Sequence, residues 1–188
     1  SAVVFGGRRQ HLAPLVYETF NWKHGVFAGA TMGSERTAAQ YGKQGEVRRD
    51  PMAMLPFCGY NMGHYFRHWL NMGKIMSKAP RIFHVNWFRT GADGKFLWPG
   101  YRENLRVLEW ILDRCNGTVG CQKTPIGYLP RLKDIDMTKL NLAEGAIKKL
   151  LAVNRKDWLE ELKGIKEFFK TFGDDLPEEL WQEYYALH

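Results

Sequence analysis

The connection between residues 86 and 104 constrains the fold of this chain most, because it is rich in turns and yet carries five aromatic rings. The apolar run before it, residues 81–86, predicts a strand, and residues 101–116 after it predict a helix. Loops normally run over the surface, so these rings either fold back into the core or pack against a flat ligand. The rings belong to Trp87, Phe88, Phe96, Trp98 and Tyr101. A nucleobase between ring faces would be such a ligand, with Asn104 hydrogen bonding to its polar edge.

Composition is that of a packed domain that could bind an anion. The chain has 188 residues, of which 45% are hydrophobic, enough for one core. A net charge of +7 and a pI near 9.3 suit a nucleotide, an acidic metabolite or nucleic acid, or only a basic solvated surface. No block of five basic residues occurs, which argues against nucleic acid.

The sequence argues against two further classes of protein, those stabilised by disulfides or zinc and those that span a membrane. The three cysteines form no C-x-x-C pair, which argues against a disulfide framework and against a structural zinc site. The apolar runs are also too short to span a membrane.

Hydrophobic periodicity predicts an α/β fold with a mixed sheet and flanking helices. The expected strands span residues 2–5, 14–20, 22–31 and 81–86, and residues 123–130 are expected to be extended. Helix and strand signals conflict over residues 22–31, where we favour a strand. The expected helices span residues 61–72, 101–116, 142–153, 154–172 and 177–187. The chain is thus helical after about residue 136, either as a helical subdomain or as helices laid over the sheet.

Local signals fix some helix ends and faces. Gly73 and Gly117 are expected to end the helices at residues 61–72 and 101–116, respectively. Asn154 is expected to cap the helix that follows it. Within residues 101–116 a helical stripe predicts the buried face. It consists of Leu105, Leu108, Leu112 and Cys115.

Arg8 and Arg9 follow an apolar strand and two glycines. A guanidinium in that position can point into a cleft at the strand end and contact phosphate in bidentate fashion. Exposed arginines are common, so an ordinary surface role is the alternative.

An ordered set of short motifs resembles the C-terminal region of GTP-dependent phosphoenolpyruvate carboxykinases nearly end to end. The set includes Phe5-Gly6-Gly7-Arg8-Arg9, Trp22-Lys23-His24-Gly25, His84-Val85-Asn86-Trp87-Phe88-Arg89, Gly94-Lys95-Phe96-Leu97-Trp98-Pro99-Gly100 and Thr124-Pro125-Ile126-Gly127. The resemblance implies that residues 1–188 are part of a larger nucleotide-binding domain. The phosphate-binding motif G-x-x-x-x-G-K-[ST] is absent from this sequence. In the family this motif, the metal ligands and the oxaloacetate-binding residues lie upstream of Phe-Gly-Gly-Arg-Arg. The resemblance therefore implies that the catalytic residues precede this chain and that the chain is inactive alone.

The resemblance also implies a guanine-nucleotide site. Phe88 and Tyr101 would sandwich the base, Phe96 would line its pocket, and Arg8 would contact the nucleotide. The family motif Phe-Gly-Glu-Asn is here Tyr101-Arg102-Glu103-Asn104, and Asn104 would read the base. Tyrosine keeps a ring face, whereas Arg102 replaces a glycine whose backbone freedom arginine lacks. This departure leaves pyrophosphate or another phosphoryl donor as an alternative to GTP.

A further implied element is an active-site lid over residues 36–46. Such a lid would exclude water and protect an enolate, whereas the alternative is an ordinary surface loop. The segment consists of Arg36, Thr37, Ala38, Ala39, Gln40, Tyr41, Gly42, Lys43, Gln44, Gly45 and Glu46.

For the parent enzyme, the resemblance implies reversible conversion of oxaloacetate and GTP into phosphoenolpyruvate, GDP and carbon dioxide. Mn²⁺ or Mg²⁺ would be needed, with ligands outside this chain. The expected partners are the remainder of the enzyme and small-molecule substrates, without nucleic acid or membrane, in the cytoplasm. A non-enzymatic basic domain is a remoter alternative.

Overall fold

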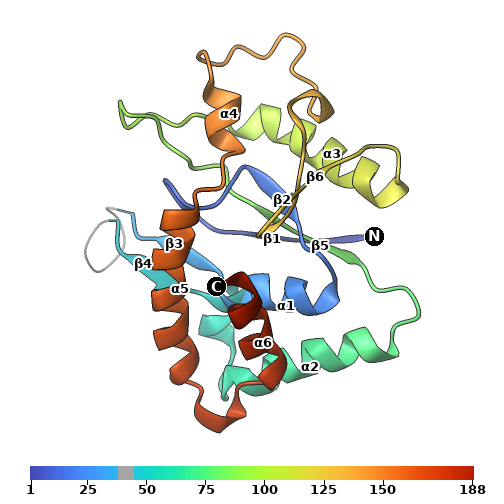
Figure 1. The fold of residues 1–188 in the computed structure, drawn as a ribbon, viewed down its shortest axis with the longest axis vertical. Coiled ribbons are helices and arrows are strands. Elements are labelled where there is room, and N and C mark those ends of the chain that lie inside the picture. The colour runs from blue at the N-terminus through green and yellow to red at the C-terminus, as the bar shows by residue number, and fades with distance from the viewer. Residues whose placement is uncertain (38–44) are drawn as a thin grey trace.

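A five-stranded mixed sheet forms the centre of the part of the chain that the computed structural model describes, residues 1–37 and 45–188 (Figure 1). The strand order is β1-β5-β2-β7-β6. Strand β1 (Ala2–Gly6) pairs in parallel with β5 (Arg81–Val85), and β5 pairs antiparallel with β2 (Val16–Glu18). Strands β6 (Gln122–Thr124) and β7 (Gly127–Leu129) form a hairpin that completes the sheet beside β2. The mixed sheet is therefore confirmed.

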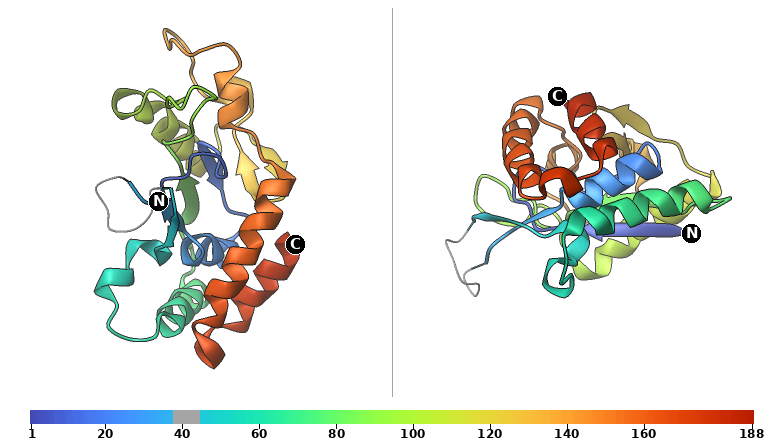
Figure 2. Two further views of the ribbon diagram at one scale, coloured as in Figure 1. Left: turned by 90° about the vertical axis from the view of Figure 1, so that its left-hand side faces the viewer. Right: turned by 90° about the horizontal axis from the view of Figure 1, so that it is seen from below.

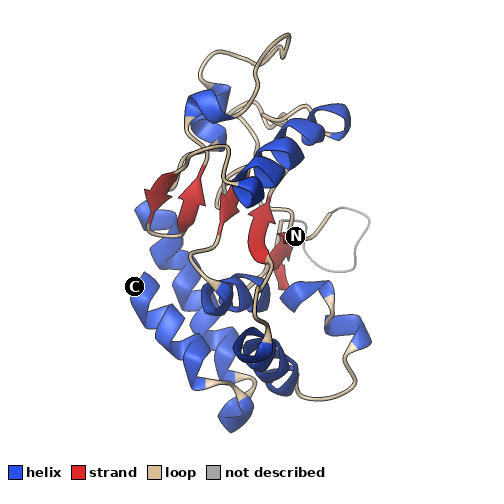
Figure 3. Cartoon of the chain, turned by 90° about the vertical axis from the view of Figure 1, so that its right-hand side faces the viewer, coloured by secondary structure: helices blue, strands red, loops and turns tan. Residues whose placement is uncertain are grey.

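Helices cover both faces of this sheet, as Figures 1 and 3 show. On one face, α1 (Trp22–Ala30), α2 (Met62–Ile75), α5 (Arg155–Lys170) and α6 (Glu178–Leu187) share one hydrophobic core. That core includes Phe27, Phe66, Leu162, Phe169 and Leu180. None of the helices in the described residues is both long enough and apolar enough to cross a membrane.

The other face is covered by α3 (Asn104–Asn116) and the short α4 (Ala146–Leu150). Their core includes Phe83, Trp98, Trp110 and Leu150. Alternate residues of β5 serve the two cores, with Ile82 in the first and Phe83 in the second, because successive strand residues point to opposite faces. The sheet is therefore a middle layer between two cores, as the two turned views of Figure 2 also show.

The strand expected over residues 22–31 is wrong, since these residues form α1. The Asn21 side chain caps this helix by accepting a hydrogen bond from the His24 backbone N–H at 2.9 Å. Every residue from His24 to Ala30 is buried. A helix buried all round lacks the polar stripe that reveals helical periodicity. Gly25 allows its close contact with the sheet, because a Cβ there would lie 2.3 Å from the Ile82 Cδ1 atom.

Two other helix boundaries also differ. Helix α2 continues past Gly73 to Ile75. Gly73 packs against the Trp22 indole, where a Cβ would lie 2.2 Å from the Cδ1 atom, so this glycine serves packing. The helix expected over residues 142–153 is only the five residues of α4, which begins after Gly145 at φ 70°. The extended segment at residues 123–130 contains the turn between β6 and β7.

Helix α3 ends as expected at Gly117, which has φ 75°, but its expected buried face is wrong. Leu105 is 67% exposed, Leu108 is 38% exposed and Leu112 is 61% exposed. The helix buries a second apolar stripe instead, made of Val107, Trp110 and Ile111. Both stripes have helical spacing, and spacing alone does not say which one faces the sheet.

A small two-stranded sheet projects beside Arg8. Strand β3 (Gly33–Glu35) pairs antiparallel with β4 (Val47–Arg49). The pairing extends one step further, because the Arg36 backbone N–H donates to the Glu46 carbonyl at 2.9 Å. Of the expected lid, residues 38–44 lie outside the described residues.

Candidate nucleotide-binding site

The candidate site lies where β1 and β5 end. Because these strands are parallel neighbours, the loop after β1 and the loop after β5 both lie at the carboxyl end of the strands. Ligands of open α/β sheets bind outside the carboxyl ends of such strands. A cavity of about 300 Å³ lies there. Its lining consists of Gly6, Gly7, Arg8, Ser34, Val85, Trp87 and Phe88.

Asn86, which is fully buried, holds the two loops together. Its side-chain oxygen accepts hydrogen bonds from the backbone N–H groups of Arg9 and Phe88, each at 3.2 Å. Its amide nitrogen donates to the carbonyls of Arg9 at 2.7 Å and Ala13 at 2.8 Å. No role for Asn86 follows from the sequence motifs alone. The signal was a single amide directly after an apolar strand, since a buried amide needs partners.

Arg8 lies against two of the expected rings. Its guanidinium carbon is 4.0 Å from the Phe88 ring centroid and 6.0 Å from that of Phe96, which is within cation–π range. The two rings meet edge to face, with centroids 5.8 Å apart and an interplanar angle of 74°. Among the described residues, no carboxylate pairs with Arg8. The cation is therefore available to an anionic ligand.

Arg9 turns away from this cavity and is held by Glu161 on α5. Two hydrogen bonds of 2.8 Å and 2.7 Å join the Arg9 guanidinium to the Glu161 carboxylate. Arg49 Nη1 donates to the same carboxylate at 2.5 Å. Burial alone would raise the pKa of Glu161, but its bonds and charge interactions with the two arginines lower that pKa overall. Arg9 thus ties the loop after β1 to β4 and α5.

Tyr101, Arg102 and Glu103 form a 3₁₀ turn, η3 (Tyr101–Glu103), in front of α3. The Tyr101 side chain is 97% exposed, and none of the rings in residues 1–37 and 45–188 contacts it. Arg102 is exposed and its φ is not positive, so arginine is unstrained where the family has glycine. Glu103 accepts a hydrogen bond from Arg106 Nε at 2.5 Å.

Asn104 is oriented by a buried tryptophan. The Trp98 side chain is 1% exposed, and its Nε1–H donates to Asn104 Oδ1 at 2.8 Å. An indole N–H can only donate, so the Asn104 carbonyl must face Trp98. The Asn104 amide N–H groups have no acceptor within the described part of the chain. They can therefore donate to a ligand.

The structure thus brings Arg8, Phe88 and Phe96 into contact but leaves Tyr101 apart. Phe88 and Phe96 are not parallel faces, and the Arg8 guanidinium lies over the Phe88 ring. A mixed sheet between helices, with an unpaired arginine and aromatic rings at the ends of two parallel strands, has the features of an anion-binding α/β protein.

Comparison with known proteins then identifies the family. The model of the phosphoenolpyruvate carboxykinase C-terminal P-loop domain matches residues 1–188, and the chain belongs to this family. It is 52% identical over 184 residues to "Phosphoenolpyruvate carboxykinase [GTP]" of Thermoplasma volcanium, covering 98% of this chain. It is 50% identical over 188 residues to the protein of the same name from Chlamydia caviae, covering 99% of this chain. The chain spans only 31% of the length of each of these relatives.

Proposed function

We propose that this chain is the nucleotide-binding and lid-bearing part of an enzyme that converts oxaloacetate and GTP into phosphoenolpyruvate, GDP and carbon dioxide. The family membership and the names of the relatives support this activity. The remainder of the enzyme would supply the phosphate-binding loop and the catalytic residues. We place the enzyme in the cytoplasm on the resemblance alone.

The orientation of Asn104 is the observation that carries the choice of guanine. Because Trp98 occupies its carbonyl oxygen, Asn104 presents amide donors. Guanine offers acceptors at O6 and N7, whereas adenine carries an amino donor in place of O6. Donors at this position therefore favour guanine. In the proposed complex Phe88 and Phe96 supply apolar walls for the base, and Arg8 pairs with phosphate oxygens.

A divalent ion would neutralise phosphate charge and stabilise the enolate when bound. Among the described residues, no three His, Cys, Asp or Glu side chains come together as ligands. On the family resemblance, we assign the Mn²⁺ or Mg²⁺ ligands to the remainder of the enzyme.

The lid is proposed for residues 36–46 on the family resemblance. Its two ends are held by the backbone bond from Arg36 to Glu46. They lie beside the candidate site, since Ser34 of β3 lines the cavity and accepts a hydrogen bond from the Arg8 backbone N–H at 3.1 Å. A segment anchored there could cover the cavity and exclude water.

The remainder of the enzyme is the proposed partner of the surface around β1 and α3. Leu105 and Leu112 are exposed on α3, which packs against β1. Within the described residues β1 is an edge strand, and its Val4 is 41% exposed. Exposed leucines and an open strand edge promote association. A polypeptide that covers this surface would bury the leucines and pair with the open edge of β1.

The test is calorimetric titration of the full-length protein with GDP. Phe88→Ala is expected to weaken binding about tenfold, because stacking of a base on an aromatic ring contributes about 1–3 kcal/mol. Phe57→Ala is the matched control, since Phe57 is 78% exposed and lies outside the cavity. Equal GDP affinity in the unchanged protein and in Phe88→Ala would refute the site.

A pyrophosphate-dependent enzyme is the second candidate, because Arg102 adds an exposed cation beside the site with no ion-pair partner in the described residues. Turnover of the full-length protein with GTP, ATP and pyrophosphate distinguishes the donors. A preference for GTP removes this candidate, whereas a preference for pyrophosphate removes the role proposed for Asn104.

A further inference from the structure

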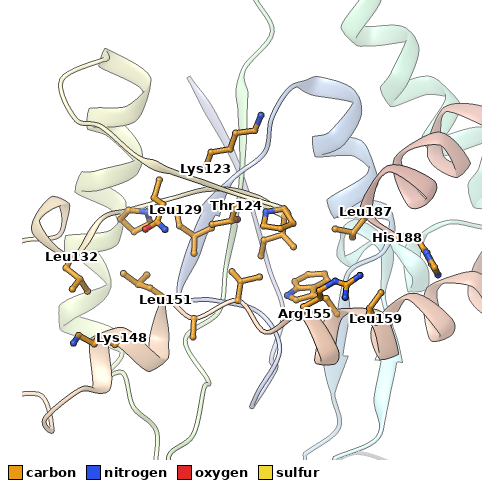
Figure 4. A pocket seen from close by; sticks show the side chains of 17 residues that line it. Lys123, Thr124, Leu129, Leu132, Lys148, Leu151, Arg155, Leu159, Leu187 and His188 are labelled. Carbon is orange, nitrogen blue, oxygen red and sulfur yellow. The ribbon is translucent and has the colours of Figure 1, made fainter.

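A second and larger cavity lies at the opposite edge of the sheet from the nucleotide site (Figure 4). It has a volume of about 680 Å³ and lies between the β6–β7 hairpin, the segment that joins α4 to α5, and the end of α6. Cavities of this size accommodate small organic ligands, which typically need about 300–1,000 Å³. It shares no lining residue with the cavity at Arg8. The nucleotide proposal therefore leaves this cavity unexplained.

The walls of the cavity are mostly apolar. They include Ile126, Leu129, Leu151, Val153, Trp158 and Leu187. Ile126 and Leu129 are each 2% exposed and belong to a small core of their own. These two side chains form a fixed apolar floor, against which the hydrocarbon part of a ligand would lose its contact with water.

The charged side chains that line the cavity include Lys123, Lys148 and Arg155, and no aspartate or glutamate is among them. None of the three cations has a carboxylate partner in residues 1–37 and 45–188. Figure 4 shows Lys148 and Arg155 on opposite sides of the cavity. Cationic side chains without carboxylate partners around an apolar recess attract an anion.

Trp158, in the apolar wall, carries an indole N–H that needs a hydrogen-bond acceptor. Its Nε1 atom is buried and has no hydrogen-bond partner among the described residues. A buried donor without an acceptor costs about 1–3 kcal/mol, and an indole N–H can be satisfied only by an acceptor. A ligand with carboxylate or phosphate oxygens would supply one.

We propose that this cavity binds a small amphipathic anion, with its apolar body on Ile126 and its head group beside Arg155. An acyl carboxylate is the simplest member of this class. Such a ligand matches the cavity in two ways. Its hydrocarbon chain packs on the apolar floor, and its carboxylate pairs with a cationic side chain of the lining.

Calorimetric titration of the full-length protein with octanoate tests this proposal, and 1-octanol is the neutral counterpart. Octanoate is expected to bind at one saturable site. Arg155→Glu should weaken binding by about fivefold or more, because it replaces an attractive charge with a repulsive one. Lys166→Glu is the matched control, since it makes the same change of charge on α5 outside the cavity.

A filling variant locates the site. Ala152 is exposed and lines the cavity, so Ala152→Trp should block octanoate, and retained GDP binding would show that the variant is folded. Equal binding of octanol would overturn the proposed anion selectivity. Undiminished octanoate binding in Ala152→Trp, or equal losses in Arg155→Glu and Lys166→Glu, would overturn the proposed location. Absence of octanoate binding to the full-length protein would mean that the remainder of the enzyme covers the cavity, which also overturns the proposal.

Discussion

Helices α5 and α3 lie on opposite faces of the same sheet and have similar apolar spacing, yet they use it differently. Helix α5 buries Leu162, Ile165 and Phe169, each at most 1% exposed. Helix α3 leaves Leu105 67% exposed and Leu112 61% exposed. The described residues of this chain thus cover the apolar residues of α5, whereas they leave an apolar stripe of α3 exposed.

The difference follows from what each helix packs against. Helix α5 shares its core with three other helices, α1, α2 and α6. Helix α3 contacts the sheet through Val107 and Trp110, and its other apolar stripe, which contains Leu105 and Leu112, faces away from that core. A helix with two apolar stripes can serve two surfaces. The described residues supply one of them, in a chain that spans 31% of the length of its relatives.

The largest expected effect is the loss of stability in Phe169→Ala. The Phe169 side chain is fully buried, with ring centroids 6.1 Å from Phe27 and 5.3 Å from Trp181. Removing a buried phenyl ring typically costs about 3–5 kcal/mol, because contacts are lost and a cavity remains. Urea denaturation of this chain should show a correspondingly lower midpoint.

Leu112→Ala is the paired variant on α3. In this chain its cost should stay within about 0.5 kcal/mol, as for most exposed positions. In the full-length protein the cost should rise, because the remainder of the enzyme is proposed to cover that face. A loss in this chain as large as that of Phe169→Ala would remove the contrast between the two helices.

The same contrast shows how far sequence could predict this fold. Local signals gave the strands at residues 2–5 and 81–86. They also gave the helix end at Gly117 and the helix start at Asn154, whose side chain accepts from the Lys156 N–H at 2.9 Å. These features depend on neighbours in sequence. The helix at residues 22–31 and the buried stripe of α3 depend on which surfaces lie nearby, and periodicity does not contain that information.

The candidate site divides in the same way. Family motifs named Arg8, Phe88 and Phe96, and the structure places these three side chains in contact. Their roles in binding stay predictions. The bonds of Asn86 and the bond from Trp98 to Asn104 could not be predicted, because each joins positions whose separation in space only the fold determines.

A further test of burial is the dependence of folding stability on pH. Burial lowers the pKa of His24 to about 4, and burial together with the charge of Arg9 lowers the pKa of His84 to about 4. Both are near 6.5 in an unfolded chain. Between these values the unfolded state binds more protons, so stability is full above pH 6.5 and is lost as pH falls toward 4. The loss should be about 2–3 kcal/mol for each histidine.

Urea denaturation of this chain between pH 7 and pH 4 measures that loss. His84→Phe should flatten the dependence, because phenylalanine can keep the stacking on Tyr17, whose ring centroid is 5.2 Å away, without titrating. His68→Phe, at an exposed position on α2, controls for the number of histidines. If His68→Phe flattened the profile as much as His84→Phe, burial would not be the cause.

The smallest expected effect on nucleotide affinity concerns Trp98, which belongs to the core beneath α3 and orients Asn104. In the full-length protein, Trp98→Phe removes the only donor that holds the Asn104 carbonyl within the described residues, so the amide can turn over. GDP affinity should fall about fivefold, which corresponds to about 1 kcal/mol for one hydrogen bond, whereas ADP affinity should fall less. Trp22→Phe is the matched control, since it removes a hydrogen bond of 2.7 Å from the Trp22 indole N–H to the Trp69 carbonyl on the other face of the sheet. Equal losses of GDP and ADP affinity in Trp98→Phe would show that Trp98 supports the fold of the site without selecting its base.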